Sequence, residues 1–520
     1  MAYLIGVDVG TTGSKTILVD EMGRLHASAL EEYPLHTPQP KWAEQNPEDW
    51  WQATVKSIRA VLAESKISPD AIKGLGLSGQ MHGLVLMDSE HRVLRPAILW
   101  CDVRTTQQCH YINETVGVDL LVQRTCNPAL EGFTAPKVIW VRDNEPDILE
   151  KTATMCLPKD YVRFRLTGEI ATEVSDAAGT LLFDVRHRRW SEEVLDKLDL
   201  DSDLLPPVYE SADVCGAITA EVTELTGLKA GTPVVGGGAD NACSAVGNGI
   251  VKAGRVSTSL GTSGAVVAHT DEAKVDPNLR AHSFCHSAPN KWYLMGVVLS
   301  AGGAFRWFRD SLGDCEVAAA KIAGVQPYEL LTQEAAKAPV GSEGLIFLPY
   351  LTGERTPHAD SNAKATFFGM TLRHGKPHLI RSVLEGVVYA MRDSLEIIRG
   401  LDTPVDQIYA TGGGARSPLW RQIQADVYNT ELVTINIAEG PAFGAAILAG
   451  VGTGVYDSVE SASDAIIKIT SSTYPIPANV KIYEEFYQIY RDLYPALKPQ
   501  FDRVTEIVSS TAKAESCGLQ

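Results

Sequence analysis

The chain has no closely spaced cysteine pair, no excess of basic residues and no long apolar run. Its nine cysteines are scattered singly, which excludes a zinc module or disulfide framework and favours a reducing cytoplasm. A net charge of −18 repels nucleic acid and anionic membranes. No uncharged apolar run reaches the roughly 18 residues of a membrane helix. We therefore expect a cytoplasmic protein with neither nucleic acid nor membrane as a partner.

The composition is that of a folded globular protein. Hydrophobic residues make up 45% and charged residues 21% of the 520 positions, which is enough apolar material for packed cores. This length predicts roughly two to four domains. Strand-like stretches such as 4–9 and 256–260 alternate with helix-like stretches such as 47–64 and 379–398. That alternation is typical of the α/β class.

A short turn of glycine and hydroxyl residues occurs twice, about half the chain apart. The first copy is Gly10-Thr11-Thr12-Gly13, and the second is Gly261-Thr262-Ser263-Gly264. Each copy lies between apolar, strand-forming stretches, which predicts a β-hairpin with a tight turn. Glycine lets backbone N–H groups approach an anion, and the hydroxyls add donors. The repeat predicts two loops that face one polyphosphate.

Two charged residues flank the first turn. Asp8 ends the preceding strand, and its carboxylate is suited to hold Mg²⁺ through water, because Mg²⁺ keeps several waters in proteins. Lys15 would place a positive charge near a transferred phosphoryl group. The hydroxyls of Thr11 and Thr12 are the expected phosphate donors. One copy of the turn alone would favour an ordinary hairpin, whereas the second copy favours a nucleotide loop.

Asp240 follows a buried strand that breaks at the three glycines 236–238, and it starts a helix-like run. An Asp at that position is often only a helix N-cap. Phosphoryl transfer to an alcohol, however, needs a proton acceptor, which is commonly Asp. Because the glycines also give a substrate room to reach the carboxylate, we favour the catalytic-base interpretation.

Three further polar turns are candidate sites. Residues 78–83 place Met81 and His82 between two strands, where a sugar or polyol would find short-reach polar groups. Residues 100–104 add Trp100, a carboxylate and a guanidinium, a combination that alone favours core packing and an ion pair. The glycines 412–414 follow a strand and open a helix, which fits a nucleotide contact and an ordinary turn equally well.

Two common phosphate-binding motifs are absent. Gly74, Gly76 and Gly79 match G-x-G-x-x-G, but they alternate along a strand that leads into another strand instead of a helix. The stretch from Gly369 to Pro377 has the wrong spacing for a P-loop and lacks its final hydroxyl residue. We therefore expect phosphate binding without either motif.

Together these segments resemble the FGGY carbohydrate kinases of the actin-like ATPase superfamily. The resemblance runs from about residue 5 to 449 and also includes 132–140, 353–386 and 412–417. It implies an α/β fold of two ribonuclease-H-like domains around a central cleft, with ATP and Mg²⁺ as cofactors. Residues 1–250 would hold the sugar and phosphate site, 251–497 the nucleotide site, and 498–520 would form a polar tail.

The resemblance also implies roles for individual residues. Asp240 matches the general base, Asn241 a sugar contact, and Asp8, together with Asp240, the metal-linked carboxylates. Other members have Gln in place of Arg306, and Pro418 stands about where several relatives have an adenine-contacting Asn. The implied nucleotide contacts are Thr11, Thr12, Lys15, Gly261, Thr262, Gly302, Arg306, Gly413, Gly414 and Ser417.

Within the family, the stretches 78–83, 98–104, 157–161 and 175–180 are most similar to the xylulose kinases. Glycerol kinases carry an Arg-Glu pair where this chain has Met81 and His82. The resemblance implies that the 5-hydroxyl of D-xylulose is phosphorylated. The implied sugar site consists of Met81, His82, Trp100, Asp240 and Asn241.

Other interpretations stay open. The same chemistry would serve L-ribulose, gluconate or glycerol. An actin-like chaperone would need a substrate-binding domain after the ATPase, and few residues follow Leu497. A sugar-responsive repressor would need an N-terminal helix-turn-helix, whereas a strand starts by Leu4. The sequence also leaves open whether the chain works alone or as a homodimer.

Overall fold

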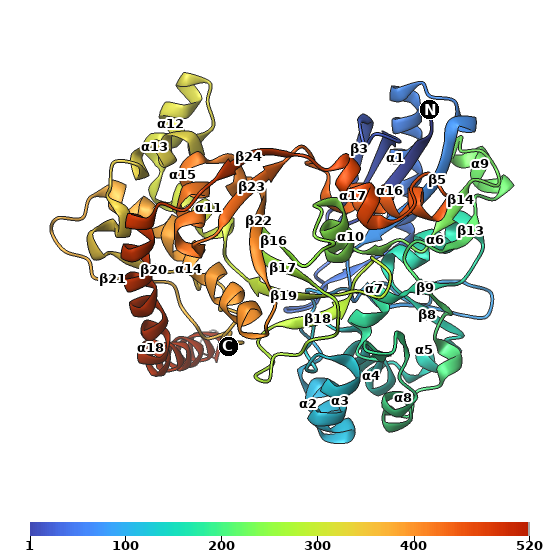
Figure 1. Cartoon of the computed structure of the whole chain (residues 1–520). Helices are drawn as coiled ribbons and strands as arrows, with labels where there is room; N and C mark the ends of the chain where they lie inside the picture. Colours follow the sequence, from blue (N-terminus) through green and yellow to red (C-terminus); the bar gives the residue numbers. More distant parts are fainter. Residues whose placement is uncertain (518–520) are drawn as a thin grey trace.

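Two seven-stranded sheets form the centres of two lobes that lie side by side (Figure 1). The structure is a computed structural model that describes residues 1–517, and the side chains of residues 1–511. The first sheet has the order β13-β14-β5-β1-β2-β3, with β15 beside β5. The second sheet has the order β18-β19-β17-β16-β22-β23-β24.

The strands of the first sheet are β1 (Tyr3–Val9), β2 (Gly13–Asp20), β3 (Leu25–Glu32), β5 (Ile72–Gly79), β13 (Val214–Ala217), β14 (Pro233–Val235) and β15 (Gly238–Ala239). Those of the second sheet are β16 (Gly254–Leu260), β17 (Gly264–Thr270), β18 (His282–Cys285), β19 (Trp292–Val298), β22 (Val405–Gly412), β23 (Glu431–Ile435) and β24 (Ile469–Thr473). Two-stranded pairs are formed by β4 (Glu44–Gln45) with β7 (Ala97–Ile98), β6 (Val85–Met87) with β8 (Thr154–Cys156), β9 (Thr172–Glu173) with β12 (Val208–Tyr209), β10 (Phe183–Asp184) with β11 (Arg189–Trp190), and β20 (Ile346–Leu348) with β21 (Thr366–Phe368).

The helices up to the end of the first sheet are α1 (Pro47–Ser65), α2 (Thr106–Ile112), α3 (Val118–Thr125), α4 (Thr134–Asn144), α5 (Pro146–Lys151), α6 (Pro158–Thr167), α7 (Val174–Ala177), α8 (Glu192–Leu198), α9 (Ala220–Thr226) and α10 (Asp240–Gly247). Those that follow are α11 (Gly302–Leu312), α12 (Asp314–Ala323), α13 (Pro327–Ala335), α14 (Lys376–Gly400), α15 (Pro418–Tyr428), α16 (Gly440–Gly452), α17 (Val459–Ile466) and α18 (Pro477–Cys517).

The two sheets repeat one topology. In the first, β1 pairs antiparallel with β2 and parallel with β5. In the second, β16 pairs antiparallel with β17 and parallel with β22. The twin turns join β1 to β2 and β16 to β17, as the sequence predicts. The expected α/β fold of two ribonuclease-H-like domains around a central cleft is thereby confirmed.

The helix predicted at 47–64 shows why these local sequences fold as they do. The Asn46 side chain accepts the Glu48 N–H at 3.1 Å and caps the first turn of α1. Acidic side chains in that turn suit the positive end of the helix dipole. The apolar stripe that includes Trp50 and Ile58 is fully buried against the first sheet.

Helix α16 belongs to the second half of the sequence but packs against the first sheet and α10 (Figure 1). Glycines on β1 and β5 allow this contact: a Cβ at Gly6 would lie 1.9 Å from the Ala442 carbonyl oxygen, and one at Gly76 would lie 2.1 Å from that of Ala445. Gly76, one of the three glycines of the rejected dinucleotide motif, therefore allows close packing of the helix on the strand. The predicted division at residue 250 falls between β15 and β16, yet α16 crosses back to the first lobe.

The segment from 498 onward differs from the expected polar tail, because α18 continues through it to Cys517. Phe501 is only 6% exposed and joins the apolar core of the second lobe. Lys498 forms ion pairs with Asp360 at 3.3 Å and Asp502 at 3.1 Å. Residues 518–520 of the expected tail lie outside the described residues.

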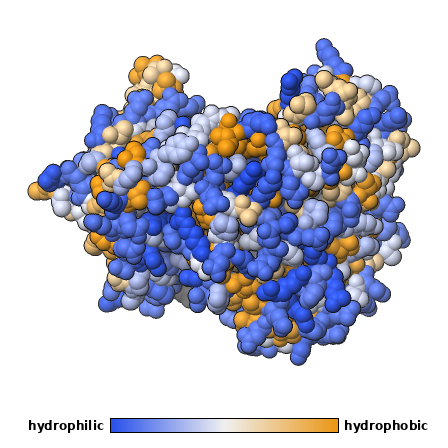
Figure 2. Space-filling view, in the orientation of Figure 1, coloured by the Kyte–Doolittle hydropathy of each residue, from blue (hydrophilic) through white to orange (hydrophobic). Residues whose placement is uncertain are grey.

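The surface is predominantly polar on the face shown in Figure 2, and its outline is notched between the two lobes. Within the described residues, no helix combines the length and the apolarity needed to cross a membrane.

Replacing Gly444 with Ala should destabilise the protein, because the added methyl group would lie 1.9 Å from the Cys243 carbonyl oxygen where α16 crosses α10. Overpacking of this kind costs about 1–3 kcal/mol, so we expect a lower Tm in a thermal melt. The matched control is Gly400→Ala, since nothing lies within 4 Å of a Cβ at that position. Equal Tm values for the two variants would contradict the close helix crossing.

Candidate active site

Three loops of the second lobe meet at the turn between β16 and β17. Gly302 donates its N–H to the Gly261 carbonyl at 2.7 Å, and Gly303 donates to the Thr262 carbonyl at 2.9 Å. Gly412 is the register partner of Leu260. A Cβ at Gly414 would lie 2.6 Å from the Leu260 side chain, so this position needs glycine. The structure thus brings together the segments that the sequence predicts for the nucleotide.

Of the other predicted nucleotide contacts, Arg306 and Gly413 are exposed beside these loops, and Ser417 caps a helix. The Arg306 guanidinium donates to the Thr262 hydroxyl at 3.1 Å and is exposed to solvent. Gly413, at the start of the 3₁₀ turn 413–416, is also exposed. The Ser417 hydroxyl accepts the Trp420 N–H at 3.2 Å and caps α15, so one part of its role is structural.

A buried amide network holds the first turn in the first lobe. Gln45 donates to the Thr11 carbonyl at 2.7 Å, and Gln80 donates to the Gly10 carbonyl at 3.3 Å and to Gln45 Oε1 at 3.0 Å. Both glutamines are 1% exposed, and Trp50 donates to Gln45 Oε1 at 3.0 Å. Because these carbonyls are engaged by the interior of the lobe, the turn is fixed in one orientation.

The two threonines of the first turn have different surroundings. The Thr11 hydroxyl donates to Gln80 Oε1 at 3.2 Å and accepts from Trp100 Nε1 at 2.9 Å. The Thr12 side chain is exposed, and its hydroxyl has no hydrogen-bond partner among the residues that the structure describes. Of the two hydroxyls, that of Thr12 is therefore the one available to a ligand.

Asp8 and Asp240 lie at the carboxyl ends of β1 and β15, two strands that flank β5. Asp8 is the last but one residue of β1, and Asp240 directly follows β15; both strands pair with β5 near Gly79. Burial and the negative charge of Asp8 raise the pKa of Asp240 to about 7. Burial likewise raises the pKa of Asp8 to about 6. The two carboxylates are thus close enough to interact electrostatically.

This carboxylate pair fits a divalent cation. Asp8 Oδ1 is buried and has no hydrogen-bond partner in the described structure, which leaves it free as a ligand. No cluster of three or more His, Cys, Asp or Glu side chains suited to a metal ion occurs among the described residues. A bound cation would therefore take most of its ligands from water and phosphate, as Mg²⁺ does.

The predicted sugar residues Met81 and Asn241 lie beside these carboxylates, and His82 follows Met81 directly. Asn241 donates from Nδ2 to Asp240 Oδ1 at 2.9 Å and approaches Met81 Sδ at 3.7 Å. The His82 ring lies 4.6 Å from the ring of Phe133, centroid to centroid. His82 Nδ1 donates to the Gly179 carbonyl at 2.6 Å, so Nε2 is the acceptor of the neutral ring.

The conformation of His82 depends on a buried lysine. Its φ of 67° is uncommon for a residue with a side chain, and its carbonyl accepts from Lys137 Nζ at 2.8 Å. Burial and the positive charge of Lys137 lower the pKa of His82 to about 3. His82 is therefore neutral throughout the physiological pH range, with an acceptor at Nε2.

Matches to protein families agree with this geometry. The FGGY family of carbohydrate kinases is matched by its N-terminal domain over residues 3–247 and by its C-terminal domain over residues 256–453. The chain belongs to the FGGY family of carbohydrate kinases. It is therefore a phosphotransferase that acts on a sugar and ATP.

Individual members of the family that are similar to this chain include xylulose kinases and a gluconokinase. The xylulose kinase of Bacillus subtilis is 41% identical over 96% of this chain and 98% of its own. The crystal structure of a xyloylose kinase from Brucella ovis has a TM-score of 0.87 at 36% identity, covering 96% of this chain and 100% of the other. The gluconokinase of Bacillus subtilis is 32% identical over 97% of this chain and 98% of its own.

Several residues of the candidate site carry no local signal in the sequence. Glu439 forms an ion pair with Lys15, which reduces the free positive charge beside the first turn. Lys137 and Gln45 act through backbone carbonyls that only the fold brings to them. By contrast, the expected ion pair at 100–104 is present, because Arg104 Nη2 lies 2.6 Å from Asp102 Oδ2.

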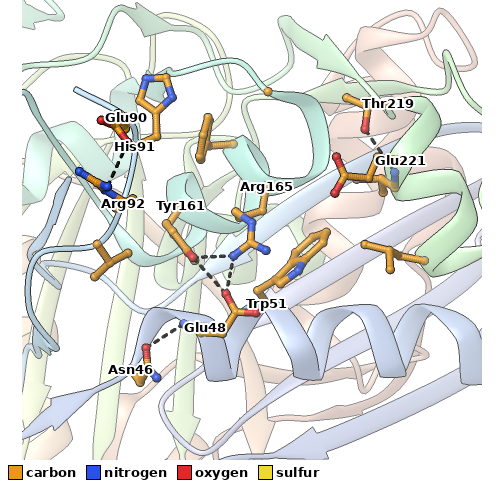
Figure 3. A pocket seen from close by; sticks show the side chains of 15 residues that line it. Asn46, Glu48, Trp51, Glu90, His91, Arg92, Tyr161, Arg165, Thr219 and Glu221 are labelled. Carbon is orange, nitrogen blue, oxygen red and sulfur yellow. Dashed lines mark hydrogen bonds and ion pairs between the residues drawn. The ribbon is translucent and has the colours of Figure 1, made fainter. Parts of the chain in front are cut away.

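A hollow of about 520 Å³ between α1, α6 and α9 lies apart from these residues (Figure 3). In its wall, Arg165 donates to the Tyr161 hydroxyl at 2.7 Å and to Glu48 at 2.5 Å. The charges of Arg165 and Glu48 are therefore already paired with each other. None of the predicted site residues lines it. The geometry assigns this hollow no part in the kinase reaction.

The variant Asp240→Asn should be more stable than the wild type at pH 8, without ligands. The folded-state pKa of about 7 lies above the ordinary 3.8, so the folded protein loses stability as pH rises through that interval. Asparagine has no such titration, and the expected gain is about 2 kcal/mol at pH 8 after allowance for solvent screening. Thermal melts from pH 4 to 8 measure it: the gain should vanish near pH 4. A pH-independent difference would contradict the raised pKa.

Proposed function

We propose that this kinase transfers the γ-phosphoryl group of ATP to the 5-hydroxyl of D-xylulose, with Asp240 as the general base. The observation that carries this proposal is the position of Asp240, which feels the charge of Asp8 on one side and accepts a hydrogen bond from Asn241, itself in contact with Met81, on the other. The similarity to xylulose kinases along nearly the whole chain supports the choice of sugar.

In the proposed reaction, Asp240 accepts the proton of the sugar 5-hydroxyl as that oxygen attacks the γ-phosphorus. A new P–O bond forms to the sugar, and the bond to the bridging oxygen breaks, which releases ADP. Asp240 then returns its proton to solvent. The raised pKa places this base close to neutral pH, where a general base accepts a proton most effectively. Most of the rate enhancement would come from positioning and charge stabilisation.

Mg²⁺, held by Asp8 and Asp240 through water, would neutralise the charge that develops on the phosphates. Thr12, Gly261 and Thr262 would contact the phosphates from the two twin turns, with Lys15 beside the transferred group. Gly302, Arg306, Gly413, Gly414 and Ser417 would surround the nucleoside. Residues 1–250 would then supply the sugar and phosphate site, and 251–497 the nucleotide site.

The sugar would be held mainly by fixed polar groups of the first lobe. Neutral His82 would accept a sugar hydroxyl at Nε2, and the amide of Asn241 would hold another beside Asp240. Trp100 is 44% exposed and would form an aromatic wall. A site of preorganised donors and acceptors suits an uncharged polyhydroxy substrate.

Gluconate is the second candidate substrate, because a gluconokinase is also similar to this chain. Its carboxylate would need a positive partner, whereas burial keeps His82 neutral. A coupled ADP assay with D-xylulose, L-ribulose, gluconate and glycerol distinguishes these substrates. We expect the highest kcat/KM for D-xylulose, and a higher value for any other member would overturn the assignment of the sugar.

The substitution Asp240→Asn should lower kcat for sugar phosphorylation about 10²-fold or more, while nucleotide binding survives. The amide keeps the shape of the carboxylate but cannot accept the proton. Steady-state kinetics and calorimetric titration with ADP measure the two effects. Asp310→Asn, at an exposed carboxylate on α11, is the control and should retain full activity. Near wild-type turnover of Asp240→Asn would exclude the base assignment.

The variants Met81→Ala and His82→Ala should raise KM for D-xylulose about tenfold or more with ADP affinity unchanged. The proposal places both side chains at the sugar, and their contacts are with first-lobe residues such as Asn241 and Phe133. Each variant removes contacts worth about one net hydrogen bond or a buried apolar side chain. Unaltered sugar kinetics in both variants would refute the pocket assignment.

A further inference from the structure

The hydroxyl of Thr11 joins the first phosphate turn to the wall of the sugar pocket. It accepts from Trp100 Nε1 at 2.9 Å and donates to Gln80 Oε1 at 3.2 Å. Gln80 immediately precedes Met81 and His82, and Trp100 is the proposed aromatic wall. One hydroxyl therefore contacts two segments of the proposed sugar site.

The directions of these hydrogen bonds are fixed by groups that can only donate or only accept. The indole of Trp100 only donates, so Thr11 must accept there. Gln80 Nε2 faces the Gly10 carbonyl, which only accepts, so Oε1 is the atom that faces Thr11. Gln45 is oriented in the same way by the Trp50 indole and the Thr11 carbonyl.

The single proton of the Thr11 hydroxyl is consequently committed to Gln80. Phosphate oxygens are acceptors, so Thr11 cannot donate to them while this bond is intact. The neighbouring Thr12 hydroxyl is exposed and engages no other group among the described residues. The two threonines, which the sequence pattern treats alike, therefore have different tasks.

We propose that Thr11 is a positioning residue that couples sugar binding to the first phosphate turn through Trp100. This inference rests on the proposed function, in which the sugar packs against the indole. A bound sugar restricts the half-exposed indole and holds its N–H on Thr11. On the other side, the buried Gln45–Gln80 pair fixes the turn. The turn is thereby held in its phosphate-binding geometry when the sugar is seated.

The coupling is reciprocal by thermodynamic necessity: if the sugar tightens nucleotide binding by some factor, the nucleotide tightens sugar binding equally. We expect a factor of about 2–10, which is the size that one net hydrogen bond supplies. The coupling also gives a reason for ATP to be held productively only when an acceptor hydroxyl is present, which limits hydrolysis by water.

A double-mutant cycle tests this coupling. Calorimetry measures the Kd of ADP without sugar and with saturating D-xylulose for the wild type, Thr11→Val, Trp100→Phe and the double variant. Valine keeps the shape of threonine without its hydroxyl, and phenylalanine keeps an aromatic ring without the indole N–H. We expect the sugar to tighten ADP binding in the wild type, each single variant to lose that effect, and the double variant to lose no more than either.

Two matched variants separate coupling from phosphate contact. Thr11→Ser keeps the hydroxyl and should keep the coupling. Thr12→Val should weaken ADP binding by the same factor with and without sugar, because its hydroxyl faces the ligand only. The proposal is overturned if the wild type shows no coupling, if the losses of Thr11→Val and Trp100→Phe add, or if Thr12→Val removes the coupling instead.

Failure of the coupling and failure of the proposed function give different results. If another sugar is the better substrate in the ADP assay, the cycle is run with that sugar. If the wild type phosphorylates its sugar but shows no sugar-dependent change in the Kd of ADP, the function stands and the coupling fails. If no sugar is phosphorylated, the proposed function fails, and any coupling found with a sugar that binds still stands on binding alone.

Discussion

The crossing of α10 and α16 is the contact on which the rest of the structure depends. The helix backbones touch there, because a Cβ at Gly444 would meet the Cys243 carbonyl and one at Gly247 would meet that of Gly440. Helix α10 begins at Asp240, and α16 begins directly after Glu439, which pairs with Lys15. One close crossing therefore sets the positions of the carboxylate and of the lysine beside the first phosphate turn.

The electrostatics of the first lobe follow from the same arrangement. Asp8 and Asp240 repel each other's ionised forms, and the charge of Lys15 is offset by Glu439. Such a site favours a ligand that brings positive charge with it, since a bare polyphosphate would meet little compensation. Under the proposed function, a nucleotide that arrives with its own divalent cation relieves both the carboxylate repulsion and the charge of the phosphates.

Much of the fold could be predicted from the sequence because its signals are local. The twin turns and the apolar strands beside them define the hairpins, and the Asn46 cap and apolar stripe define α1. The placement of α16 on the first sheet could not be predicted, because it depends on glycines such as Gly6 and Gly76 that meet a helix some 400 positions away. The continuation of α18 was also missed: Phe501, Val504, Ile507 and Val508 recur at helical spacing within a polar stretch, and of these only Phe501 is buried.

The candidate site also contains residues that the sequence reveals locally and residues that only the fold reveals. Asp8 and Asp240 stand out locally, because a carboxylate at the end of a buried strand beside glycines is unusual unless it serves a ligand or a cap. Gln45 and Glu439 leave no such signal, because each acts on a partner from a distant part of the chain.

A local pattern shows that Thr11 and Thr12 lie in a turn, but only the surrounding fold shows where each hydroxyl donates. Because one hydroxyl has one proton, its committed partner decides what else it can bind. Neighbouring side chains can thus give two adjacent hydroxyls of one turn separate tasks.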